Sequence, residues 1–298
     1  MRFSFWISTN HTWNEVLDLA SHAEATGWDG LWVADHFMPN DDNALDDPMQ
    51  ECLALLAALA ASVPRVRLGS LVLGNTYRHP AVVAKTAATI DQISGGRLVL
   101  GIGAGWQENE HARYGIPLGT VTERIDWFEE ACEVIAGLRA EARTTVAGSH
   151  YQLEEAPLEP KPTGPMPLLI GASGQKRMAR IVAKYADEWN TWSTPELWLE
   201  KRVGFDQALD EAGRDRASLY RSTQALVFLG DDGKATADDF AKVRPAIGGT
   251  SQQLIDTIGQ WADAGLDELI VPSFTLGEGA RAKEAIDQII TEVAPAFR

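Results

Sequence analysis

Cysteine is scarce in this chain of 298 residues, which carries only Cys52 and Cys132. Each lies among residues with helical spacing, so we expect two small, buried apolar side chains. No Cys-x-x-Cys pair or histidine-rich cluster occurs, so the sequence predicts no metal site. Such cysteine usage is typical of proteins in a reducing compartment, and we therefore expect a cytoplasmic protein.

Positive charge is also scarce, with 26 Lys and Arg against 42 Asp and Glu and a net charge of −16. A nucleic-acid-binding protein needs a basic face, so we expect no nucleic-acid partner. Attachment to an anionic membrane surface is disfavoured for the same reason. The overall charge still allows an anionic small molecule to bind in a locally basic pocket.

Long hydrophobic runs are missing as well. No apolar stretch approaches the roughly 18 residues of a membrane-spanning helix. The N-terminal stretch "MRFSFWIS" lacks the charged head, apolar middle and cleavage site of a signal peptide. We therefore expect no membrane partner. The chain is nevertheless 45% hydrophobic, which suffices for a large core.

Short apolar runs alternate along the chain with longer runs of helical spacing, and this pattern predicts a parallel sheet. The expected strands are Arg2–Ser8, Asp29–Asp35, Val66–Gly74, Gly96–Gly105, Pro167–Gly174, Asp187–Trp192, Tyr220–Gly230 and Asp267–Phe274. The expected helices are Trp13–Gly27, Met49–Val63, His79–Ile93, Arg124–Ala140, Gln175–Tyr185, Pro195–Ala212, Ser251–Gly265 and Arg281–Val293. Eight such units in a chain of 298 residues predict an α/β fold, a (β/α)8 TIM barrel, as a single domain over residues 1–298. An open, doubly wound sheet is the alternative.

Some segments fall outside this rhythm. The stretch Arg143–Ala156 alternates and contains Ala-Gly-Ser, so we expect an inserted hairpin. The polar segments Asp41–Asp47, Gly115–Thr122 and Asp231–Lys242 are expected to be loops. These segments make the predicted barrel one with insertions.

Polar residues follow several of the expected strands, at the end where TIM barrels place their active sites. Asp35 and His36 end the second strand. Histidine is the side chain best suited to move a proton near neutral pH. The pair is equally compatible with an acid that caps a turn and a histidine that satisfies a loop carbonyl.

Two further turns carry small residues. The run "GIGAG" (Gly101–Gly105) does not have dinucleotide-binding spacing, and it either lets a ligand touch the backbone or makes a tight turn. The turn Ser173-Gly174 opens a helix that carries Lys176 and Arg177, and a helix N-terminus with nearby cations favours a phosphate. A charged helix face exposed to solvent is the other explanation for the cations.

On these motifs the chain resembles the luciferase-like monooxygenase superfamily, and within it the branch that uses the deazaflavin coenzyme F420. The resemblance covers nearly the whole chain. It is strongest in "GWDGLWVADHF", "LGSLVLGNTYRHPAVVAKTAATIDQISGGRLVLGIGAGW", "IGASGQKRMARIVAKYADEWN" and "GTSQQLIDTIGQWADAGLDELIV". It implies a luciferase-like barrel, a bound deazaflavin, a small organic substrate and a homodimer.

The resemblance also assigns roles to individual residues. It implies that His36 is the proton donor or acceptor, and that a cis peptide bond joins Leu71 and Val72 against the cofactor ring. The positions that it implies for cofactor binding are Asp35, Leu71, Val72, Gly74, Ala104, Gly105, Asn109, Ser173, Gly174, Lys176 and Arg177.

The chain departs from the sugar-phosphate dehydrogenase of this branch at one position. Trp106 stands where that enzyme has an acidic residue, so the same substrate is not expected. Trp106 and Trp192, with Trp6, Trp13 and Trp189, predict an aromatic substrate pocket. The first hypothesis is an F420-dependent oxidoreductase. The alternatives are an FMN-dependent monooxygenase on the same barrel and a flavin-binding or deazaflavin-binding protein that catalyses no reaction.

Overall fold

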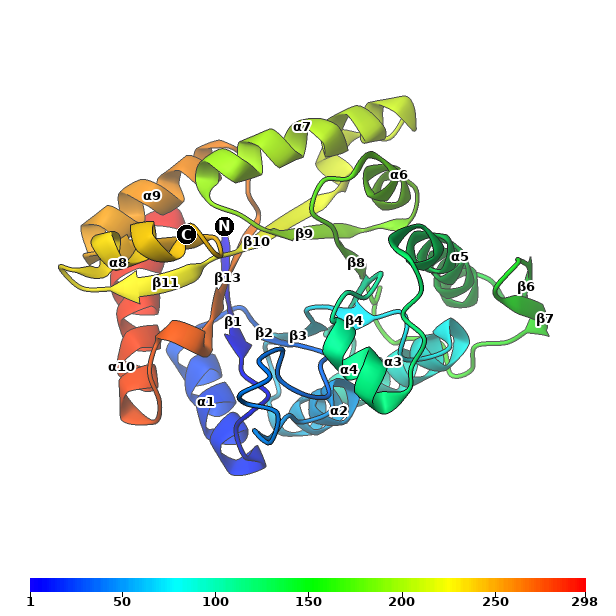
Figure 1. The fold of residues 1–298 in the computed structure, drawn as a ribbon, viewed down its shortest axis with the longest axis horizontal. Helices are drawn as coiled ribbons and strands as arrows, with labels where there is room; N and C mark the ends of the chain where they lie inside the picture. Colours follow the sequence, from blue (N-terminus) through cyan, green and yellow to red (C-terminus); the bar gives the residue numbers. More distant parts are fainter.

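The computed structural model describes all 298 residues, and Figure 1 shows a ring of strands surrounded by helices. The strands of the main sheet are parallel and run in the order β3-β2-β1-β13-β10-β9-β8-β5-β4, and β3 also pairs with β5, which closes the ring. These strands are β1 (Arg2–Ile7), β2 (Gly30–Val33), β3 (Arg67–Ser70), β4 (Leu73–Gly74), β5 (Leu98–Gly103), β8 (Leu168–Gly171), β9 (Glu188–Trp192), β10 (Tyr220–Gln224) and β13 (Glu268–Pro272). Because β3 and β4 are two parts of one strand, the ring is an 8-stranded barrel, and the predicted fold is confirmed.

The helices cover the outside of this barrel (Figure 1). They are α1 (Trp13–Thr26), α2 (Cys52–Ser62), α3 (Pro80–Ser94), α4 (Glu108–Tyr114), α5 (Val121–Ala140), α6 (Lys176–Tyr185), α7 (Pro195–Glu211), α8 (Gly233–Phe240), α9 (Ser251–Asp263) and α10 (Ala280–Gln288). Short helical segments at Arg216–Ser218, Ser273–Thr275, Ile289–Val293 and Ala294–Phe297 complete the set. Local signals set several ends: a capping box of Thr12 and Glu15 begins α1, and Gly27 in the left-handed region ends it.

The core has two main parts. The larger one, a cluster of 68 buried residues, fills the space between the strands and the surrounding helices. The smaller one lies among barrel strands and includes Trp6, Trp32 and Leu71. The two cysteines are free and buried, as predicted. No helix of the chain combines the length and the apolar character needed to cross a membrane.

Two sequence predictions about elements were wrong. The segment Asp231–Lys242 contains α8 rather than only a loop; α8 is short and polar, and it buries just Gly233 and Ala237. The expected strand Tyr220–Gly230 is divided: β10 stays in the barrel, and β11 (Leu226–Leu229) pairs in parallel with β12 (Ala246–Gly249) in a separate sheet. The expected strand Val66–Gly74 is present as β3 and β4, and the two parts are separated at the cis Leu71–Val72 bond that the resemblance implies.

The predicted hairpin is present. Strands β6 (Thr144–Ala147) and β7 (Gln152–Ala156) pair antiparallel with one register shift. Figure 1 shows this hairpin beyond α5, away from the ring. The chain ends meet on the barrel, where the N-terminal ammonium of Met1 donates to the carbonyl of Phe297 at 3.0 Å.

Candidate active site

A cavity of about 720 Å³ opens where the barrel strands end and the chain turns toward the helices. We call it the cup. Residues from both halves of the sequence form its wall, because the carboxyl ends of the parallel strands meet at one rim of the barrel. Most of the predicted site residues line it: Asp35, His36, Leu71, Val72, Gly74, Ala104, Gly105, Trp106, Ser173 and Trp192. The other four, Asn109, Gly174, Lys176 and Arg177, do not, and the roles of all fourteen stay predictions.

His36 faces the cup with one ring nitrogen already engaged. Its Nδ1 lies 2.9 Å from Oε1 of Glu110, and 23% of its side chain is exposed. Trp106 packs edge-on against the imidazole, with ring centroids 5.4 Å apart. The Nε2 atom makes no hydrogen bond within the protein, so it is the atom that can exchange a proton with a bound molecule.

Glu110 is a site residue that the sequence did not reveal. It lies on α4, its side chain is fully buried, and it accepts from His36, from the backbone N–H of Phe37 at 2.7 Å and from the hydroxyl of Tyr77. Burial alone raises the pKa of Glu110, but the hydrogen bonds from His36, Tyr77 and Phe37 outweigh it and lower that pKa. The carboxylate is therefore ionised at neutral pH. No local spacing marks it, because 74 positions separate it from His36.

Asp35 takes a different partner from the adjacent histidine. Arg78 grips its carboxylate with two N–H groups at 2.7 and 2.8 Å, and the backbone N–H of Gly74 donates at 2.9 Å. Arg78 also pairs with Glu51. Asp35 is buried with both oxygens occupied, so it holds the turn after β4 in place rather than orienting His36.

One part of the cup wall is made by Leu71, Val72 and the glycines Gly103 and Gly171. The cis bond between Leu71 and Val72 lies where the resemblance places it. A Cβ atom on Gly103 would lie 2.9 Å from the side chain of Val72, and one on Gly171 would lie 3.0 Å from it. The absence of side chains on these two glycines leaves room for Val72 on the wall of the cup.

The expected phosphate-binding turn is only partly on the cup. Ser173 and Gln175 line it, and α6 begins at Lys176 without any side chain capping its amides. Lys176 is exposed and lies off the wall. Arg177 pairs with Asp126 at 2.5 Å and with Glu129, because α5 presents carboxylates to it.

Three cations that the sequence did not single out line the cup instead: Arg124, Lys201 and Arg244. Lys201, on α7, donates to the hydroxyl of Thr191 at 3.0 Å and to the carbonyl of Trp192 at 2.7 Å, and burial lowers its pKa. Arg244 lies over the ring of Trp192, 4.9 Å from its centroid. None of the three cations has a carboxylate within ion-pair distance, so the cup is locally basic in an acidic chain.

Aromatic side chains form another part of the wall. Trp6 packs on Trp192 at 5.6 Å and on Phe274 at 5.0 Å between ring centroids. Trp106 is 55% exposed at the rim. Trp13 and Trp189 do not line the cup, contrary to the sequence prediction. Trp13 begins α1 and packs against the large core cluster. Strand alternation turns Trp189 outward, and it stacks on Phe205 at 3.8 Å.

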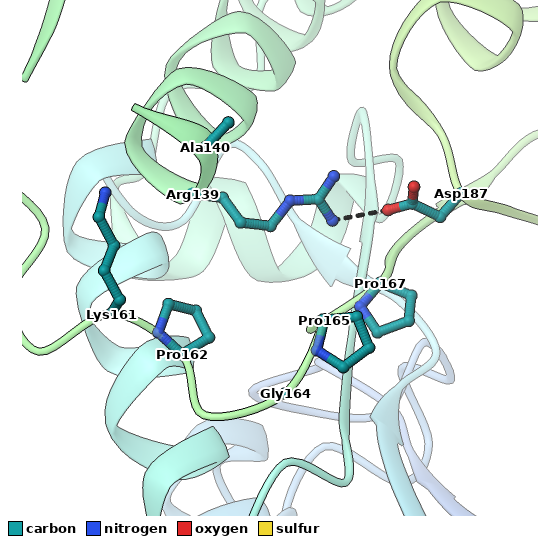
Figure 2. A pocket seen from close by; sticks show the side chains of 8 residues that line it. All are labelled: Arg139, Ala140, Lys161, Pro162, Gly164, Pro165, Pro167 and Asp187. Carbon is teal, nitrogen blue, oxygen red and sulfur yellow. Dashed lines mark hydrogen bonds and ion pairs between the residues drawn. The ribbon is translucent and has the colours of Figure 1, made fainter. Parts of the chain in front are cut away.

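A second hollow, of about 620 Å³, lies at the opposite end of the barrel, beside the starts of β8 and β9 (Figure 2). Its two cations already have partners. Arg139 pairs with Asp187 at 2.6 Å, and Lys161 donates to carbonyls at the end of α5, one of them that of Leu138 at 2.7 Å. These contacts fix the proline-rich segment that leads into β8, so we assign this hollow a structural role. No group of three or more His, Cys, Asp and Glu side chains in the chain is arranged to hold a metal ion.

Comparison with known proteins gives one family. The sequence model described as luciferase-like monooxygenase matches residues 1–294. The F420-dependent glucose-6-phosphate dehydrogenase of Microbacterium testaceum is 36% identical over 207 residues, which are 68% of this chain and 60% of that protein. The enzyme with the same description from Kineococcus radiotolerans is 36% identical over 222 residues, 73% of this chain and 65% of that protein. The aligned part thus spans less than two thirds of these relatives.

The fold is shared by solved structures. One is described as an F420-dependent secondary alcohol dehydrogenase in complex with an F420-acetone adduct. It superposes with a TM-score of 0.86 over 100% of this chain and 99% of that one, at 23% identity. At this identity the likeness shows that the two proteins share a fold.

Proposed function

Because the chain belongs to the luciferase-like monooxygenase family, whose model matches residues 1–294, we propose that it is an oxidoreductase that uses coenzyme F420. It would move a hydride between this deazaflavin and a small organic substrate, with His36 as proton donor or acceptor. One observation carries the proposal: a cup that is lined by glycines, by cations without carboxylate partners and by a histidine with a free ring nitrogen. The descriptions of the two curated relatives support the choice of cofactor.

The residues of the cup fit a deazaflavin. Its flat ring would rest against Leu71, Val72 and the glycine-rich turn after β5, where added Cβ atoms would collide with Val72 or, at Gly105, with Thr76. Its phosphate and glutamate tail is anionic, and the cup offers uncapped α6 amides together with Arg124, Lys201 and Arg244. The positions proposed to contact it are Asp35, Leu71, Val72, Gly74, Ala104, Gly105, Asn109, Ser173, Gly174, Lys176 and Arg177.

The chain's own residues supply the proton and the orientation. When bound, the cofactor provides the hydride acceptor or donor. His36 exchanges the accompanying proton at Nε2. The aromatic surface of Trp6, Trp106 and Trp192 orients the substrate and reduces its contact with water.

The substrate wall favours an alcohol or a carbonyl compound with apolar groups next to the reacting carbon. Trp106 lies directly against His36, in the place of an acidic side chain. The only carboxylate on the wall, Asp35, is held by Arg78. A polyhydroxylated sugar would therefore find few acceptors beside its reacting carbon.

The cofactor assignment is tested by titrating the purified apoprotein with F420 and, in parallel, with FMN, and following fluorescence. We expect saturable binding of F420 at micromolar concentrations and weaker binding of FMN. Lack of F420 binding would refute the proposal. Tight FMN binding with oxygen uptake would favour an FMN-dependent monooxygenase, and F420 binding without turnover of any alcohol or ketone would indicate a binding protein.

We further propose a homodimer that resides in the cytoplasm. The family resemblance supports the dimer, and the two free, buried cysteines are consistent with a reducing compartment. Light scattering after size exclusion would reveal the mass of the assembly, and a monomer across micromolar concentrations would contradict the dimer. Fractionation of the source cells would test the compartment.

A further inference from the structure

The surroundings of His36 fix which of its ring nitrogens carries the proton in the neutral form. An ionised carboxylate can only accept hydrogen bonds. The Glu110 carboxylate, 2.9 Å from Nδ1, therefore requires a proton on that nitrogen. Nε2, on the side of the cup, is then a bare acceptor.

Glu110 is itself held rigidly. The N–H of Phe37 donates to one of its oxygens at 2.7 Å, and Tyr77 donates its hydroxyl to the other. Burial and the bond to Glu110 raise the pKa of Tyr77, so this hydroxyl stays protonated and keeps donating. Tyr77 also stacks on His111, at 4.7 Å between ring centroids. The carboxylate is thus pre-positioned before any ligand enters the cup.

The remaining charges near this cluster balance each other. Asp35 and Arg78, the other ionised groups that influence Tyr77, form a bidentate pair. Glu110 is the one carboxylate in contact with His36. No lysine or arginine forms an ion pair with Glu110. A proton gained at Nε2 would create an imidazolium beside the buried Glu110 carboxylate, and the negative charge of Glu110 would stabilise this imidazolium.

We propose that Glu110 is the positioning residue of this site, which keeps neutral His36 as the Nδ1–H tautomer so that Nε2 accepts a hydroxyl proton from an alcohol substrate. The inference rests on the proposed function for its substrate. In the step, the O–H bond breaks and its proton goes to Nε2, while the carbinol C–H bond breaks and its hydride goes to the oxidised deazaflavin. The C–O bond becomes C=O, so one alcohol yields one carbonyl product.

The tautomer can be read without cofactor or turnover. The apoprotein, labelled with ¹⁵N-histidine, is titrated while the imidazole nitrogens are followed by NMR, with His36→Asn identifying the resonances. We expect the basic form of His36 to show a protonated Nδ1 and an unprotonated Nε2. The opposite tautomer in the wild-type protein would overturn the proposal, whether or not the Glu110 variant folds.

Glu110→Gln removes the charge and retains the shape. We expect His36 to lose its preference for the Nδ1–H form and kcat to fall by about 10–100-fold, the usual cost of losing such a partner of a functional histidine. Tyr77→Phe removes a donor but retains the carboxylate, so the tautomer should persist.

The outcomes separate the two proposals. A wild-type tautomer and a wild-type kcat in Glu110→Gln would refute the role of Glu110. An equal loss of Nδ1–H preference in Tyr77→Phe would also refute it, since the carboxylate would then not be the cause. Failure of F420 to bind would refute the proposed function, while the NMR result on the apoprotein would stand independently.

Discussion

Charged side chains are paired with one another at one end of the barrel and lack such partners at the other. At the end where the strands begin, Arg67 donates to Glu188 at 2.5 Å and to Glu268 at 2.7 Å, and Trp32 donates to Glu268 at 3.1 Å. The guanidinium of Arg67 thus joins two buried carboxylates, and a single oxygen of Glu188 is left without a partner. At the cup, by contrast, Arg124, Lys201 and Arg244 line a cavity without a carboxylate partner, and one nitrogen of His36 is free.

The difference separates stability from function along the same strands. Buried charges that pair with one another help to hold the barrel strands together. Removal of one partner leaves the other charges buried without compensation. A charge or proton-transfer group without a partner can interact with a ligand instead. Changes at the strand starts should therefore alter unfolding, and changes at the strand ends should alter binding and turnover.

The largest effect is expected at the cup. His36→Asn removes the proton-transfer group, and turnover should fall by about 10²–10⁴-fold. The melting temperature and the affinity for F420 should remain close to wild type. The matched control is His150→Asn, since His150 is exposed in the hairpin. Turnover within twofold of wild type in His36→Asn would contradict the assigned role.

At the opposite end, Arg67→Met should lower the free energy of unfolding by about 3–5 kcal/mol, because two buried carboxylates lose their cation. Chemical denaturation measures this effect. Arg65→Met, at a side chain that is 68% exposed, should cost under about 1 kcal/mol, because Glu24 keeps the backbone N–H of residue 65 as a donor at 2.6 Å. Equal costs for the two variants would show that the charge network does not stabilise the barrel.

A smaller effect, on cofactor affinity, distinguishes Lys201 in the cup from Lys176, the cation that the sequence analysis favoured. Lys201→Met should weaken F420 binding about tenfold, as expected for loss of one charge-assisted hydrogen bond. Lys176→Met, at the exposed position off the wall, should weaken it less. Fluorescence titration of both variants gives the order, and a greater loss in Lys176→Met would favour the phosphate turn predicted from the sequence.

The smallest expected effect is on the pH dependence of stability, at the end of the barrel where the strands begin. Burial raises the pKa of Glu188, although Arg67 opposes the shift. A carboxyl whose pKa is higher in the folded state contributes most to stability below its unfolded pKa and less as pH rises through the folded value. Glu188→Gln removes this dependence and retains a hydrogen-bond acceptor, so stability should change by under about 1 kcal/mol.

Denaturation of Glu188→Gln and the wild type between about pH 4 and pH 8 measures this dependence. The free energy of unfolding of the variant should increase relative to that of the wild type as pH rises. A relative gain as pH falls would mean that Glu188 is an ordinary ionised partner of Arg67.

Much of the fold could be predicted because its signals are local. Alternating apolar runs mark the strands, and residues such as Thr12 and Gly27 mark helix ends. Helix α8 escaped prediction because its polar sequence buries only Gly233 and Ala237. The division of Tyr220–Gly230 between two sheets escaped it too, since pairing partners are not encoded within the strand.

The sequence by itself determined which residues would stand at the strand ends, because strand and helix periodicity places Asp35, His36 and Ser173 there. Only the tertiary structure decided their partners. It turned Arg177 toward α5, joined Asp35 to Arg78 and joined His36 to Glu110. The physical reason is that hydrogen bonds and ion pairs act over a few ångströms in space, whereas residues far apart in sequence meet only when the barrel closes.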